Sequence, residues 1–160
     1  MSSKELLERI QVLSRQTRYK IYTESVAAFC DAALESMGRP SHSLSVVFVG
    51  AREMRVLNRR YLKRNYATDV LSFSYGSMKM EGIPFLGEII LAPEIAVDQA
   101  MRFRTSPERE LRKLLVHGIL HLLGQDHETD RGQMNLLQKR LLRRKFFQNA
   151  DPIADLKVKQ

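Results

Sequence analysis

The chain has 160 residues, of which 44% are apolar, a size and composition that suit one soluble domain, so we expect a single domain over residues 1–160. Its one cysteine, Cys30, excludes an internal disulfide and agrees with a reducing compartment. The most apolar segment, residues 114–123, is too short to span a bilayer, and the first residues lack the apolar stretch of a secretory signal. We therefore expect a cytoplasmic protein without a membrane partner.

The net charge of +8 is concentrated in two segments. Residues 52–64 hold six basic side chains and one acidic one, and residues 139–145 hold five basic side chains and no acidic one. Each segment therefore carries +5, and the remainder of the chain sums to −2. Clusters of this kind suit a polyanion-binding surface, because each phosphate contact releases counterions. The alternative is a pair of solvated helix faces that only keep the protein soluble.

Periodicity in the first fifty residues predicts strands and a helix. Residues 4–14 fit a strand around residues 10–13 or a helix, and we favour the strand. Apolar residues at three- and four-residue spacing predict an amphipathic helix from about residue 22, which ends at Gly38. Its apolar face includes Cys30, which we expect to be a small buried thiol. The next segment, residues 44–49, has the continuous apolar run of a buried strand.

A basic helix and two further strands are predicted next. The helix spans about residues 52–62, with Met54, Leu57 and Tyr61 on its inner face and its arginines outside. The segment T-D-V-L-S-F, residues 68–73, alternates as a strand. A loop that contains Gly76, Gly82 and Pro84 leads to the strand at residues 87–91, and the two strands are candidates to pair across it.

Three helices are predicted in the second half. Pro93 marks the start of one that continues through Phe103, and Ser106 caps the next, with Pro107 at its first position. The inner face of the last helix is formed by Met134, Leu137 and Leu141. We expect the polar tail after about residue 149 to be frayed. Strands before helices predict the α+β class, with a small mixed β-sheet packed against several helices, the histidine-bearing helix among them.

Three of the four histidines lie within H-G-I-L-H-L-L-G-Q-D-H, residues 117–127. His117 and His121 are four residues apart, so they lie one turn apart on the same face of a helix. Gly124 can end that helix and let the chain fold back, which would bring His127 round as a third nitrogen ligand. One histidine on an apolar helix is more often a core or capping residue. Three at this spacing predict a catalytic type of zinc site, with an open fourth position.

Gly118 separates this motif from the metalloproteases that share its spacing. In H-E-x-x-H-x-x-G-x-x-H enzymes, a glutamate after the first histidine transfers protons during peptide hydrolysis. Glycine cannot accept a proton, and it weakens a helix interior by about 1 kcal/mol relative to alanine. Its presence indicates close packing or a need for space beside the metal. A peptidase would therefore lack its main catalytic group.

The order of T-D-V-L-S-F, G-E-I-I and the histidine motif resembles the YbeY family of bacterial metal-dependent endoribonucleases. The resemblance extends from about residue 44 to residue 134. It implies one zinc ion on His117, His121 and His127, no small-molecule cofactor, and cleavage of single-stranded RNA. It also implies a role in ribosomal RNA maturation and ribosome quality control, with rRNA and the ribosome as partners.

The chain departs from the family pattern at a position thought to serve catalysis or substrate binding. The family usually has an arginine there, and this chain has Leu62 after Tyr61. A nearby cation is the candidate substitute, and its role cannot be assigned to one residue. The candidate RNA-binding residues are Arg59, Arg60, Lys63 and Arg64. Milder departures are Ala67 in place of a proline and Glu88 in place of an aspartate.

The chemistry that we expect is hydrolysis of a phosphodiester. Zinc held by three imidazoles lowers the pKa of a bound water from about 15.7 to about 7 and polarises a phosphoryl oxygen. Whether water or the ribose 2′-hydroxyl attacks is not readable from the sequence, and no catalytic side chain is assigned. Two alternatives stay open. One is a metalloprotease, and the other is a non-catalytic ribosome-associated protein with a structural zinc.

Overall fold

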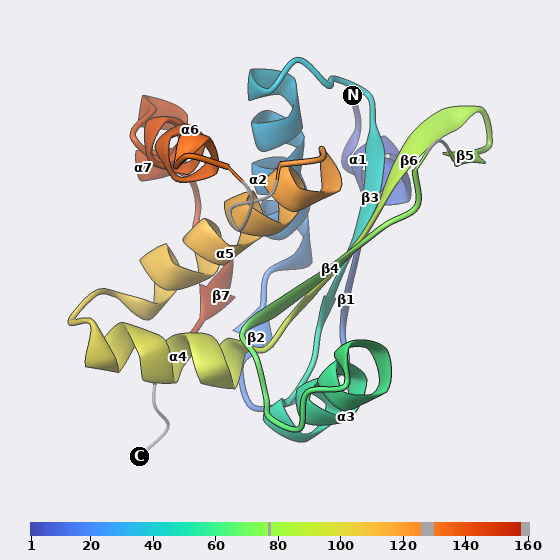
Figure 1. Ribbon diagram of the computed structural model, residues 1–160. Helices are drawn as coiled ribbons and strands as arrows, with labels where there is room; N and C mark the ends of the chain where they lie inside the picture. Colours follow the sequence, from blue (N-terminus) through green and yellow to red (C-terminus); the bar gives the residue numbers. More distant parts are fainter. Residues whose placement is uncertain (77, 126–129, 158–160) are drawn as a thin grey trace.

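The fold is built on a mixed β-sheet with the strand order β1–β3–β6–β4 (Figure 1). The computed structural model describes residues 1–76, 78–125 and 130–157. Strands β1, β3 and β6 are parallel neighbours, and β4 runs antiparallel to β6 at the edge. The predicted pairing of β4 with β6 is therefore confirmed. The strands are β1 (Ile10–Ser14), β3 (Ser43–Phe48), β4 (Val70–Ser74) and β6 (Ile83–Leu91), and β5 (Lys79–Met80) pairs with the start of β6.

Helices cover both faces of this sheet, and the predicted α+β class is confirmed. Figure 1 shows α3 on one face and α2 with α5 on the other. The favoured strand near residue 10 is confirmed, and a short helix precedes it. The helices are α1 (Ser3–Arg9), α2 (Thr23–Ser36), α3 (Ala51–Leu62), α4 (Pro93–Arg102), α5 (Pro107–Leu122), α6 (Gln133–Leu142) and α7 (Lys145–Gln148).

The alternation of side chains along the strands divides the core in two. Val46 and Ile89 belong to the larger cluster, which includes buried residues of α2 and α5. Val47 and Ile90, their neighbours along the strands, belong to a smaller cluster with Met54 of α3. Successive side chains of a strand point to opposite faces. Helix α3 therefore packs on the face of the sheet opposite to α5.

Two predicted inner positions, Tyr61 and Leu137, are wrong, and each lies on a helix with limited cover. Tyr61 is 54% exposed and packs edge-on against Phe73, while the inner face of α3 is formed by Met54 and the buried amide of Asn58. The helix predicted to continue through Phe103 ends one residue earlier, and Phe103, its C-cap, is 75% exposed. On α6, Leu137 is 37% exposed and Gln138 is buried in its place. Pro84 lies inside β6, near its start, and not in a loop.

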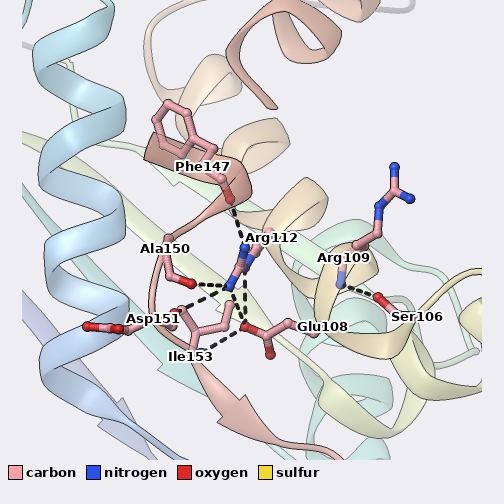
Figure 2. Close-up of polar contacts among 8 residues, drawn as sticks. All are labelled: Ser106, Glu108, Arg109, Arg112, Phe147, Ala150, Asp151 and Ile153. Atoms are coloured by element: carbon pink, nitrogen blue, oxygen red, sulfur yellow. Dashed lines mark hydrogen bonds and ion pairs between the residues drawn. The ribbon is translucent and has the colours of Figure 1, made fainter. Parts of the chain in front are cut away.

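The expectation of a frayed tail is wrong for the described part of that segment. Ile153 and Leu156 are buried, and β7 (Ala154–Asp155) pairs with β2 (Lys20–Ile21). The side chain of Arg112 on α5 hydrogen-bonds to the backbone of the residues that precede β7 (Figure 2). Its guanidinium donates to the carbonyl oxygens of Phe147, Ala150 and Asp151 at 2.7, 2.9 and 3.3 Å. One carboxylate oxygen of Glu108 accepts from both Arg112 and the backbone of Ile153.

Cys30 is buried on α2, as predicted. Burial raises the pKa of its thiol from 9.0 to about 12, and the neighbouring Asp31 carboxylate adds to the shift. The thiol therefore stays protonated and unreactive at neutral pH. Within the described residues, no helix combines the length and the apolar character that crossing a bilayer requires.

Candidate metal centre and adjoining groove

Helix α5 carries the paired histidines, and its first turn is set by local sequence. The hydroxyl of Ser106 accepts a hydrogen bond from the backbone N–H of Arg109 at 3.1 Å, and Pro107 occupies the first turn. This cap satisfies one of the N–H groups that a helix start leaves unpaired. The predicted start of this helix is confirmed. Leu111, Leu115 and Ile119 are fully buried and attach it to the sheet and to α2.

Gly118 is the point of closest approach between α5 and the sheet. A Cβ atom at this position would lie 2.9 Å from Cγ2 of Ile89, and two further atoms of that side chain are within 3.2 Å. Ile89 is fully buried, so it has little room to move. The close-packing interpretation of Gly118 is therefore confirmed. A glutamate of the protease type would collide with the sheet at this place.

The rings of His117 and His121 lie edge to face on the same side of α5. Their Nε2 atoms are 3.2 Å apart, and the ring centroids are 4.7 Å apart. Two nitrogens on one tetrahedral zinc ion, at 2.0–2.1 Å each, lie about 3.3 Å apart. The observed separation thus fits two ligands of a single ion. Both side chains are partly exposed, so an ion and a substrate can reach them.

Gln138 of α6 orients the ring of His117. Its Oε1 lies 3.1 Å from Nδ1 of His117, and the Gln138 side chain is buried. An amide oxygen only accepts hydrogen bonds, so this contact favours the tautomer with the proton on Nδ1 and the lone pair on Nε2. That tautomer presents Nε2 to a metal. Gln138 was not singled out in the sequence analysis. Its position four residues after Met134, on the predicted inner face of this helix, was the available signal.

The third predicted ligand, His127, lies outside the described residues. Within the described residues there is no group of three or more histidine, cysteine, aspartate or glutamate side chains arranged to hold a metal ion. The described site therefore consists of two imidazoles and the amide that orients one of them. The full ligand set remains a prediction.

A pocket of about 290 Å³ opens beside His117. Its walls come from four parts of the chain, since Asp69 precedes β4, Phe103 follows α4, Lys113 lies on α5 and Asn135 on α6. The pocket gives a ligand access to one side of the imidazole pair. Elements distant in sequence thus converge next to His117.

The predicted RNA-binding residues are placed on the other side of the sheet. The side chains of Arg59, Arg60, Lys63 and Arg64 are exposed on α3 and just after its end. Lys63 terminates the helix in the left-handed conformation, at φ 56°. Leu62, which stands where the resemblance led us to expect an arginine, is 46% exposed. The structure thus does not bring these cations to the imidazole pair, and RNA binding by them stays a prediction.

Together, the fold and this site define an α+β protein whose paired imidazoles adjoin a surface pocket, an arrangement suited to an enzyme. The family model described as Endoribonuclease YbeY matches residues 9–145. The chain belongs to this family.

Individual proteins of the same family are also similar to this chain. The chain is 41% identical over 109 residues to the endoribonuclease YbeY of Thermodesulfovibrio yellowstonii, with 68% of this chain and 67% of that protein aligned. It is 36% identical over 121 residues to the Aquifex aeolicus protein of the same name, with 76% and 80% aligned. Among solved structures, the solution structure of a Thermotoga maritima protein matches 82% of this chain and 85% of its own, with a TM-score of 0.58 and 26% identity.

Proposed function

We propose that this protein is a zinc-dependent endoribonuclease that cuts single-stranded RNA in the cytoplasm. Membership in the endoribonuclease YbeY family supports RNA cleavage. The observation that carries the metal dependence is the 3.2 Å separation of the two Nε2 atoms, because it matches the spacing of two zinc ligands. We extend the proposal to ribosomal RNA maturation and ribosome quality control, with the ribosome as partner, because the sequence motifs resemble those of this family.

His117, His121 and His127 would hold the ion. When bound, zinc supplies a nucleophile at neutral pH and polarises the phosphoryl group. Gln138 keeps the proton of His117 on Nδ1, so that the lone pair of Nε2 can coordinate. The buried apolar residues of α5 fix the helix, and so hold both imidazoles in place while the substrate binds.

The direct test compares wild type, His121→Ala and wild type treated with a chelator on a labelled single-stranded RNA. Stoichiometric zinc is measured in the same preparations by elemental analysis. We expect zinc-loaded wild type to cut, and the variant to remain folded, to bind RNA and to cut at least a hundredfold more slowly. Equal cutting by chelated and untreated protein would refute the metal dependence.

Two alternatives are separated by the same samples. A metalloprotease would cleave unstructured casein in a chelator-sensitive way, but the place of its glutamate is held by Gly118 against Ile89. A structural zinc would make His121→Ala unfold, or leave RNA processing intact in a folded variant. Circular dichroism shows whether the variant is folded, and the RNA cleavage assay shows whether a folded variant still processes RNA.

A further inference from the structure

Beyond the pocket beside His117, a second and larger pocket of about 690 Å³ lies between α5 and α6. The two pockets share three wall residues, Phe103, Glu110 and Lys113. They therefore lie next to each other, and we name the two together the α5–α6 groove. The groove leads from the imidazole pair toward the N-terminal end of α5.

One wall of the α5–α6 groove is a stripe along α5. Arg109, Lys113 and His117 follow one another at four-residue spacing, and His121 continues the series. Residues at this spacing lie on one helix face. With a rise of 1.5 Å per residue, the stripe places Arg109 about 12 Å along the helix from His117. Two cations thus line the approach to the imidazoles.

The facing wall adds two further cations from α6 and its C-terminal end. Lys139 and Arg143 are also four residues apart, both are exposed, and both line the larger pocket. Within the described residues, no carboxylate lies within 4.0 Å of the charged groups of Lys139, Arg143 or Arg109. Figure 2 shows the Arg109 guanidinium directed away from the polar network around Arg112. These three charges are available to an anionic ligand.

An aromatic ring and a carboxylate lie where the two pockets meet. Phe103 is 75% exposed, and no other ring within the described residues stacks on it, which is unusual for a phenylalanine. The buried Glu110 has one oxygen 3.9 Å from the Lys113 ammonium, so its negative charge is compensated by a neighbouring cation. The groove thus combines cations with an exposed ring.

We propose that the α5–α6 groove binds a single-stranded polynucleotide on its way to the imidazole pair, with Arg109, Lys139 and Arg143 on phosphates and Phe103 stacked on a base. This inference rests on the proposed ribonuclease function for its direction, since the groove ends at His117. Binding of single strands by proteins combines a cationic groove with aromatic rings that stack on bases. An acidic protein segment would find the cations but would have no comparable use for the exposed ring.

The test reverses two groove charges and compares them with two matched charges on the same segment. Lys139→Glu with Arg143→Glu removes cations that line the groove. Arg140→Glu with Arg144→Glu makes a charge change of the same size at exposed neighbours that do not line it. Binding of a fluorescent single-stranded RNA is measured by anisotropy at several salt concentrations. All proteins carry His121→Ala, so that the RNA is not cut.

We expect the groove variant to bind at least tenfold more weakly than its matched control at about 0.1 M salt. The dependence of log affinity on log salt should also become shallower, by about 0.7 for each phosphate that the variant no longer binds. Equal weakening by both double variants would overturn the proposal, since it would show only a response to net charge. Thermal unfolding of each variant verifies that these exposed substitutions leave the fold intact.

Phe103 provides a second, independent comparison. Phe103→Leu should reduce RNA affinity by about fivefold or more, and Phe103→Tyr should keep it, because base stacking needs an aromatic face. Equal affinity of the leucine variant and wild type would overturn the stacking part. Stronger binding of a polyglutamate peptide than of RNA, abolished in the groove variant, would assign the groove to an acidic protein instead.

Failure of this inference is distinguishable from failure of the proposed function. If wild type cuts RNA in a zinc-dependent way and the groove variant binds RNA as tightly as its control, the groove assignment is wrong and the function stands. If wild type cuts no RNA but the groove variant loses RNA binding, the groove assignment stands and the catalytic proposal is wrong.

Discussion

At the scale of single residues, Gly118 shows how packing restricts which chemistry a helix can carry. A methyl group at this position meets Ile89, so we expect Gly118→Ala to destabilise the protein by about 1–3 kcal/mol, despite the better helix propensity of alanine. Urea unfolding measures the change. In an Ile89→Ala background, the same substitution should cost less, because the colliding atoms are gone. An equal cost in both backgrounds would assign the effect to another contact.

Gln138 is the second residue for which a single contact makes a prediction. Because its amide oxygen orients His117, Gln138→Leu should weaken zinc binding by about 10- to 100-fold. Gln138→Glu, which keeps an acceptor at this place, should retain most of the affinity. Competition with a chromophoric chelator gives the zinc dissociation constant directly. Indistinguishable zinc affinities for the leucine variant and wild type would remove Gln138 from the site.

The buried thiol of Cys30 should make the stability of wild type more sensitive to alkaline pH than that of Cys30→Ala. Its pKa is about 12 in the fold, above the 9.0 of an unperturbed thiol, so the unfolded chain releases the proton first. The stabilisation that comes from the protonated Cys30 thiol is fully present below pH 9. It is lost as pH rises toward 12, by about 1 kcal/mol per pH unit. Wild type should therefore lose unfolding free energy between pH 9 and pH 10.5 faster than Cys30→Ala. Parallel losses in the two proteins would contradict the buried-thiol account.

At the scale of elements, Arg112 joins α5 to the C-terminal segment. Its side chain is 12% exposed and bonds to three backbone carbonyls and to Glu108 (Figure 2). Replacement by methionine leaves the three carbonyls without this donor and leaves the Glu108 carboxylate with only the Ile153 N–H, so we expect a loss of about 3–5 kcal/mol. Hydrogen exchange at Ala154 should accelerate together with global unfolding.

Arg109 is the matched control for Arg112. It lies on the same helix, but its guanidinium is exposed and points away from the carbonyls. Arg109→Met should therefore change stability by less than about 0.5 kcal/mol. Similar losses in both variants would mean that the carbonyl network contributes little.

At the scale of the whole molecule, the sheet separates two basic surfaces. The α5–α6 groove lies on the side of α5, while Arg59 and Arg64 belong to the α3 side. We expect a short RNA of about six nucleotides to contact only the α5–α6 groove. A longer RNA can extend past the edge of the sheet and also contact the α3 side. Arg59→Glu with Arg64→Glu should thus weaken binding of a 30-nucleotide RNA several-fold and leave the hexamer unchanged. Anisotropy titrations with both lengths measure this, and equal effects on both would place α3 at the cleavage path.

The local sequence determined much of the fold. The cap at Ser106 that opens α5, the apolar spacing of α2 and the alternation of β4 are properties of neighbouring residues, so they were predicted correctly. The pairing of His117 with His121 likewise follows from helical periodicity alone.

Tertiary structure decided what local pattern cannot contain. Tyr61 and Leu137 have the spacing of inner residues, but cover depends on which distant elements reach a helix, and none buries them fully. The tail docks because Arg112 and β2 offer hydrogen-bonding partners far away in sequence. The contact of Gln138 with His117 and the meeting of α5 with α6 in one groove arise in the same way. Periodicity reports which face of an element is apolar, and only the packed chain determines what lies against it.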